Sequence, residues 1–115
     1  MNKTLFILTI SLVFIYACSS PSTTVAEKAF HVYGNCEKCK ARIEKAANLK
    51  GVAQGNWHID SKLFTCKLDT VLTSTEEVLK AIAAVGHDNE SFPANDYAYD
   101  KLPTCCQYER VEHVK

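Results

Sequence analysis

Hydrophobic and polar positions alternate along residues 28–33, where Phe30 and Val32 fall on one face. This period of two is typical of a half-buried strand. From residue 39 to residue 49 the apolar side chains recur every three or four positions instead, which predicts an amphipathic helix that ends before Gly51. The folded part of the chain therefore begins with a strand and a helix joined by a short loop.

Two further alternating stretches follow, at residues 52–59 and 62–69. Asp60 and Ser61 lie between them and favour a tight turn. Strand patterns this close in sequence pair most simply with each other, so the two stretches predict an antiparallel β-hairpin.

The next segment has the sequence of a capping box, with Ser74 followed three residues later by Glu77. Apolar positions then continue at helical spacing to Val85, and Gly86 stands where a helix C-cap is expected. Residues 87–92 are expected to form a short last strand. The resulting order predicts an α+β fold, a ferredoxin-like βαββαβ sandwich with both helices on one face of an antiparallel sheet.

The two ends of the chain do not follow these patterns. Residues 93–115 show no clear period and are expected to be an irregular C-terminal extension outside a domain of residues 28–92. At the other end, Lys3 precedes an apolar run from Leu5 to Tyr16 that is too short to span a bilayer. Residues 1–18 therefore have the character of an export signal.

The apolar run ends in Ile15-Tyr16-Ala17-Cys18, which resembles the lipobox of bacterial lipoproteins. The resemblance implies that Cys18 is lipidated, that residues 19–27 are a flexible Ser/Thr/Pro tether, and that the exported protein is held on a bacterial membrane facing the periplasm. Ordinary signal cleavage after Ala26 is the alternative, and it would give a secreted protein without Cys18.

Charge and cysteine content exclude two classes of protein, nucleic-acid-binding proteins and fully disulfide-paired frameworks. The 115 residues contain 13 Lys and Arg against 13 Asp and Glu, and no basic stripe stands out, so nucleic acid is not an expected partner. Of the six cysteines, five follow Cys18. An odd number excludes a framework in which every thiol is paired within the chain.

Cys36 and Cys39 form a Cys-x-x-Cys pair between the first strand and the first helix. The thiolate is the form that binds metals and attacks disulfides, and a helix N-terminus favours it. Lys38, Lys40 and Arg42 are nearby cations that are expected to act in the same direction. The pair is thus suited either to holding a soft metal ion or to cycling as a disulfide.

Among metal ions, copper(I) fits two thiolates best, because soft ligands favour soft ions and few ligands suffice. Mercury(II) is bound by the same chemistry. Zinc prefers four ligands, of which Cys36 and Cys39 supply two.

The element order together with Cys36 and Cys39 resembles the heavy-metal-associated (HMA) domain family, which includes copper chaperones, metal-ATPase modules and periplasmic mercury-binding proteins. The resemblance covers residues 27–92 and implies that the two cysteines are metal ligands. The family motif is Gly-Met-x-Cys-x-x-Cys, whereas Tyr33-Gly34-Asn35-Cys36 has one residue fewer and no Met. That Met normally packs under the loop, and Tyr33 is expected to fill its place.

His87 falls at a position that is occupied in the family by Tyr, Lys, Phe or His beside the metal loop. It is a candidate third ligand or a cation that balances thiolate charge, and the alternative is an exposed histidine at a turn. His31 and His58 are expected on the sheet surface. Cys66 shares a face with Phe64 and is expected to be a buried, inert thiol.

Cys105 and Cys106 are adjacent thiols in the extension. They extend the metal site if the extension folds back over the Cys36 loop. There are two alternatives. One of the two thiols forms a disulfide, either with Cys66 or with another chain, or both remain free.

Three functions follow from these observations. The first is a non-enzymatic protein that binds copper(I) through Cys36 and Cys39 and passes it to the metal-binding domain of a metal-transporting ATPase or efflux pump. The second is a thiol-disulfide oxidoreductase, although the Pro-bearing loop that thioredoxin-like proteins place opposite the dithiol has no candidate before Pro93. The third is a protein-binding module with an oxidised Cys pair.

Overall fold

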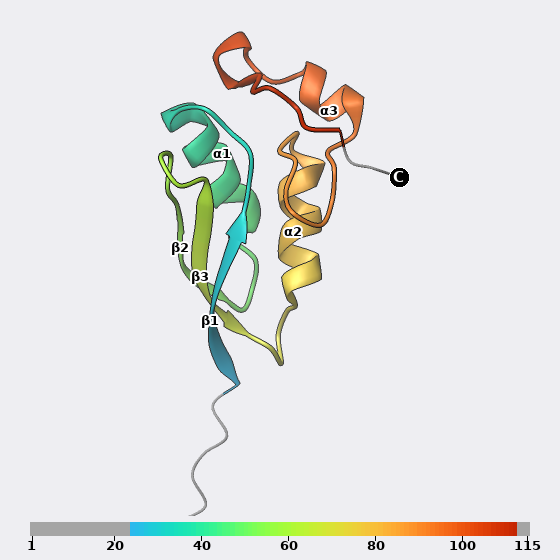
Figure 1. Ribbon diagram of the computed structural model, residues 1–115. Coiled ribbons are helices and arrows are strands. Elements are labelled where there is room, and N and C mark those ends of the chain that lie inside the picture. The colour runs from blue at the N-terminus through green and yellow to red at the C-terminus, as the bar shows by residue number, and fades with distance from the viewer. Residues whose placement is uncertain (1–23, 113–115) are drawn as a thin grey trace, which may run out of the picture.

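The computed structural model describes residues 24–112, which form a three-stranded sheet with two helices against one of its faces (Figure 1). The elements are β1 (Val25–His31), α1 (Glu37–Ala47), β2 (Val52–Trp57), β3 (Leu63–Asp69) and α2 (Thr75–Ala84). β3 lies in the middle of the sheet and is antiparallel to both neighbours. The α+β ferredoxin-like fold expected from the element order is confirmed.

β1 begins earlier than the sequence predicts. Val25 pairs with Asp69 and Glu27 with Lys67, so the last residues of the expected 19–27 tether belong to the sheet. The signal peptide, Cys18 and the remainder of the tether lie outside the described residues. Within residues 24–112, no helix has the length and hydrophobicity needed to cross a bilayer.

The fourth strand expected at residues 87–92 is reduced to a single bridge between Val32 and Asn89. The side chain of Asn89 explains why the strand does not continue. Its Oδ1 accepts the backbone N–H of Phe92 at 2.9 Å, while its Nδ2 donates to the carbonyl of Leu79 at 2.8 Å. Asn89 therefore turns the chain back on itself after one residue of pairing.

The start of α2 follows the capping-box prediction. The Ser74 hydroxyl accepts the N–H of Glu77 at 3.2 Å, and the Glu77 carboxylate accepts the N–H of Ser74 at 3.1 Å. Two of the unpaired N–H groups of the helix N-terminus are thereby satisfied. After the helix, Gly86 adopts a φ of +103°, a left-handed conformation that favours glycine.

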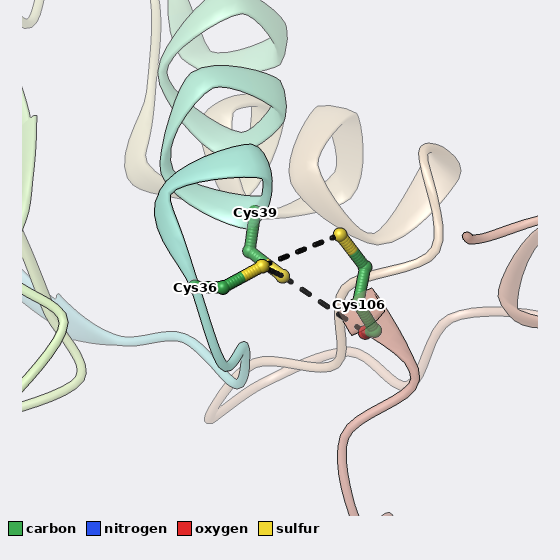
Figure 2. A group of neighbouring side chains, drawn as sticks. All are labelled: Cys36, Cys39 and Cys106. Atoms are coloured by element: carbon green, nitrogen blue, oxygen red, sulfur yellow. Dashed lines mark hydrogen bonds between the residues drawn. The ribbon is translucent and has the colours of Figure 1, made fainter. Parts of the chain in front are cut away.

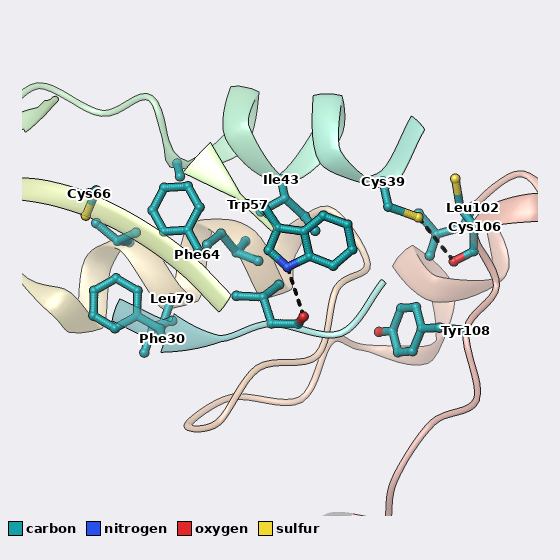
Figure 3. Packing of buried hydrophobic residues seen from close by; sticks show 14 of the residues in the cluster. Phe30, Cys39, Ile43, Trp57, Phe64, Cys66, Leu79, Leu102, Cys106 and Tyr108 are labelled. Carbon is teal, nitrogen blue, oxygen red and sulfur yellow. Dashed lines mark hydrogen bonds between the residues drawn. The ribbon is translucent and has the colours of Figure 1, made fainter. Parts of the chain in front are cut away.

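The core fills the space between the sheet and the two helices (Figure 3). β3 shows the alternation that the sequence predicted, with Phe64, Cys66 and Leu68 buried on one face. Opposite them, Ile43 of α1 and Leu79 of α2 are also buried. Burying the apolar face of each element against the others is the main source of stability for a domain of this size.

Residues 93–112, which we call the tail, are not the irregular extension outside the core that the sequence suggested. The tail contains a short helix α3 (Asp96–Asp100) and the 3-10 turn η1 (Thr104–Cys106), and it crosses the end of the domain where α1 begins and α2 ends (Figure 1). Leu102, Cys106 and Tyr108 are buried in the main core cluster. The compact unit therefore extends well beyond residue 92.

Candidate metal centre

The Cys-x-x-Cys pair lies at the N-terminus of α1. Cys36 is the N-cap residue, with an extended backbone, and Cys39 stands in the first turn, fully buried. The apolar spacing of Ile43 and Ala47 directs one face of α1 into the core and brings Cys39 onto the same face. The two sulfurs are 3.7 Å apart, so the helix presents both thiols at one point.

The loop before Cys36 rests on Trp57. A side chain at Gly34 would place a Cβ 2.9 Å from the indole ring, closer than real contacts allow, so glycine permits the loop to lie flat on the ring. The indole Nε1 donates to the Val32 carbonyl at 3.1 Å and fixes the ring in place. Trp57, rather than Tyr33, supports this loop, and Tyr33 instead stacks on Tyr108 of the tail with 6.2 Å between ring centroids.

A third thiol joins the pair from the tail. The Cys106 sulfur is 3.7 Å from that of Cys36, and the ligand atoms of Cys36, Cys39 and Cys106 all lie within 4.8 Å of one another. Figure 2 shows the three side chains converging from α1 and η1. Among the described residues, these three cysteines are the one set of three or more His, Cys, Asp or Glu side chains whose ligand atoms lie close enough to share a metal ion.

The environment of the two paired thiols differs sharply. The pKa of Cys36 is lowered to about 7, chiefly because the backbone N–H of Cys39 stabilises its thiolate. Burial instead raises the pKa of the Cys39 thiol to about 11. The ammonium group of Lys40 binds Glu44, Asn56 and the Trp57 carbonyl, so its hydrogen bonds go to these groups and not to the Cys36 thiol.

These pKa values predict a single reactive thiol in the reduced, metal-free protein. Iodoacetamide should modify Cys36 first, with a rate that rises through a midpoint near pH 7, because the thiolate is the nucleophile. Cys105 is exposed but its pKa is raised, chiefly by its hydrogen bond with Cys106, so it should react later. Peptide mapping by mass spectrometry after timed alkylation measures both rates. A midpoint near the ordinary thiol value of about 8.5 would contradict the prediction.

His87 does not belong to the sulfur cluster. Its ring is fully buried, so it is not the exposed turn histidine offered as the alternative. Nδ1 lies 2.8 Å from the Tyr33 carbonyl, and the ring stacks on Tyr108 with centroids 5.6 Å apart. Burial lowers the pKa of His87, which favours the neutral ring and a proton on Nδ1. Metal ligation by His87 stays a prediction that this arrangement does not favour.

The other two cysteines of the described segment, Cys66 and Cys105, lie outside the three-thiol group. Cys105 is exposed, its carbonyl accepts from the Cys36 thiol at 3.5 Å, and its sulfur lies 3.9 Å from that of Cys106 but is not part of the group of three converging sulfurs. Cys66 is buried in β3, as expected, and burial raises the pKa of its thiol. All five cysteines of the described segment are free thiols, and Cys66 lies at the opposite end of the core from Cys106 (Figure 3). The disulfide considered between them is therefore absent.

His31 and His58 have the partly or fully exposed positions expected for sheet-surface histidines. What the sequence patterns missed is the support of the site by Trp57 and Tyr108. Composition offered one signal for this support. The chain has a single Trp, and Tyr108 stands two residues after Cys106; side chains this large usually pack in a core, which would have placed the tail against the domain.

Fold and thiol cluster together define a class: a small α+β domain of the HMA-like copper-chaperone fold with a cysteine group that can hold a soft metal ion. The solved structures similar to it include a CopZ metallochaperone, at 23% identity and a TM-score of 0.53, covering 56% of this chain and 98% of its own. They also include a CopA variant from Bacillus subtilis in its copper form, at 27% identity and a TM-score of 0.50, covering 61% of this chain and 97% of its own. The chain matches no protein-family model and no curated protein.

Proposed function

We propose that this protein is a membrane-tethered copper(I)-binding protein that holds its ion through Cys36 and Cys39 and transfers it to the metal-binding domain of a metal-transporting ATPase or efflux pump. The observation that carries the proposal is the pair of sulfurs 3.7 Å apart at the N-terminus of α1. The likeness to a metallochaperone and to a CopA domain supports the same assignment. No catalytic turnover is part of this function.

The donor set favours a soft ion. Sulfur atoms make up the whole cluster, and among the described residues no carboxylate or imidazole lies within its 4.8 Å limit. Such a set suits copper(I), and mercury(II) by the same chemistry. A structural zinc site usually has four protein ligands, and this group offers three.

The placement of the site is compatible with a membrane anchor. β1 begins at the end of the domain opposite the Cys36 loop (Figure 1), so a chain anchored through Cys18 would leave the site facing away from the bilayer. Cleavage after Ala26, the alternative to lipidation, would remove the first two residues of β1. We propose that the protein stands on the periplasmic side of a bacterial membrane, held by a lipid on Cys18, as the lipobox-like Ile15-Tyr16-Ala17-Cys18 suggests.

A thiol-disulfide oxidoreductase is the second candidate. One observation favours it: Cys36 is partly exposed with a pKa lowered to about 7, while Cys39 is buried with a raised pKa. An attacking thiol followed by a protected resolving thiol has this arrangement. The two candidates differ in whether the protein keeps a bound ion or turns over disulfides.

The test uses the mature chain purified without oxygen and fully reduced. Titration with copper(I) against a chromophoric chelator should give one tightly bound ion per monomer, and mixing the loaded protein with a soluble ATPase metal-binding domain should move the ion. An insulin-reduction assay on the same sample should show no activity above dithiothreitol alone. Failure to compete with the chelator, together with disulfide turnover, would replace the first candidate by the second.

A further inference from the structure

We propose that Cys106 is a third ligand of the soft-metal site and that the tail is a latch which holds it there. The inference rests on the proposed function of Cys36 and Cys39 and adds to it the regulation of that site. A two-thiolate site offers its ion freely to a partner, whereas a latched three-thiolate site retains the ion until the tail moves.

The sulfur positions suit trigonal coordination. Two of the three separations, from Cys36 to Cys39 and from Cys36 to Cys106, are 3.7 Å, and the third is no more than 4.8 Å. A triangle of this size has its centre about 2.3 Å from each sulfur, which is the length of a zinc–thiolate bond. An ion at the centre therefore reaches all three sulfurs without a large movement of the backbone.

Tyr108 holds the tail beside the site. Its hydroxyl donates to the Gly86 carbonyl at 2.8 Å and accepts the N–H of Asp88 at 2.6 Å. The Tyr99 hydroxyl donates to the Tyr108 carbonyl at 2.5 Å. The two bonds of the Tyr108 hydroxyl join the tail to the chain that follows α2, two residues away from Cys106, and the Tyr99 bond fixes the tail internally.

Arg110 adds an ionic contact to the same region. Its guanidinium binds the buried carboxylate of Asp88 through two nitrogens, at 2.9 and 3.0 Å, and donates to the Ala94 carbonyl at 2.6 Å. A second carboxylate, that of Asp96, lies 2.8 Å from Nη1. Bidentate pairs of this kind fix orientation as well as distance, so the tail has one defined position over the cluster.

Cys105 provides the matched comparison. It is the chain neighbour of Cys106 and carries the same thiol, yet it is exposed and outside the group of converging sulfurs. Cys106 is fully buried in the core cluster. Cys105 and Cys106 are the same residue type at neighbouring positions, and only Cys106 is placed to be a ligand. Cys105→Ser is therefore the matched control for Cys106→Ser.

The latch has a defined consequence for transfer. Passing the ion on requires that a bond from the metal to an incoming partner thiolate forms while the bond to Cys106 breaks. The metal keeps its oxidation state, and the proton released by the incoming thiol is taken up by Cys106. Because Cys106 occupies the position that an incoming thiolate needs, the tail must lift for exchange to proceed.

The experiment compares the wild-type mature chain with Cys106→Ser and Cys105→Ser, each loaded with one equivalent of copper(I) under reducing, anaerobic conditions. X-ray absorption should show three sulfur neighbours in the wild type and in Cys105→Ser, and two in Cys106→Ser. Chelator competition should show a loss of affinity of about tenfold for Cys106→Ser alone. Near-ultraviolet circular dichroism from Trp57 reports whether each variant is folded.

A further variant tests the latch with every thiol in place. Arg110→Gln should speed transfer to an ATPase metal-binding domain several-fold, because the tail lifts more easily. Two sulfur neighbours in the folded wild type, equal affinity for Cys106→Ser, or an unchanged transfer rate for Arg110→Gln would overturn the latch while leaving binding by Cys36 and Cys39 intact. Absence of copper(I) binding in the wild type would instead overturn the proposed function itself.

Discussion

Replacing both Cys36 and Cys39 by serine is expected to lower copper(I) affinity by about a thousandfold or more, which corresponds to about 4 kcal/mol. The change leaves Cys106 as the last of the three clustered sulfurs and replaces the other two by hydroxyl groups, which are hard donors with little affinity for a soft ion. Competition against a copper(I) chelator under anaerobic, reducing conditions measures the loss.

Each single substitution separates the two ligands. Cys36→Ser removes the thiol whose pKa is about 7, and Cys39→Ser removes the buried one, so either variant should bind more weakly than the wild type and more tightly than the double variant. Cys66→Ala is the matched control, because that thiol is buried in β3 outside the cluster. Full affinity in the double variant would mean that the ion binds elsewhere.

The sequence predicted most of the fold because the signals that define it are local. Alternation in β3, helical spacing in α1 and the Ser74 capping box each depend on a few neighbouring residues, and each is found in the structure. The strand expected at residues 87–92 does not form, because a side-chain contact with a residue distant in sequence interrupts it. The side chain of Asn89 bonds to the carbonyl of Leu79, in a helix that the strand pattern does not include.

The site was predicted only in part. Cys36 and Cys39 are three residues apart, so their convergence at a helix N-terminus follows from spacing. Cys106 is 70 residues from Cys36, and nothing in the polar segment around it indicates that it is the buried member of the pair with Cys105. That distinction depends on Tyr108 and Arg110, whose partners in the fold are Gly86 and Asp88.

The second large effect concerns stability. Trp57→Ala is expected to lower the free energy of unfolding by about 3–5 kcal/mol, the usual cost of deleting a large aromatic side chain from a core. The ring is fully buried, lies under Gly34, and bonds to the Val32 carbonyl through Nε1. Urea unfolding of the reduced, metal-free protein, followed by far-ultraviolet circular dichroism, measures the change.

Trp57→Phe separates the two roles of this residue. Phenylalanine keeps much of the apolar volume but cannot donate to Val32, so its cost should be smaller, about 1–2 kcal/mol. Because the loop before Cys36 rests on the indole, Trp57→Ala should also weaken copper(I) binding in the fraction that remains folded, although every cysteine is retained. Unfolding free energies within about 1 kcal/mol of the wild type for Trp57→Ala would contradict the prediction that the buried ring is a main support of the domain.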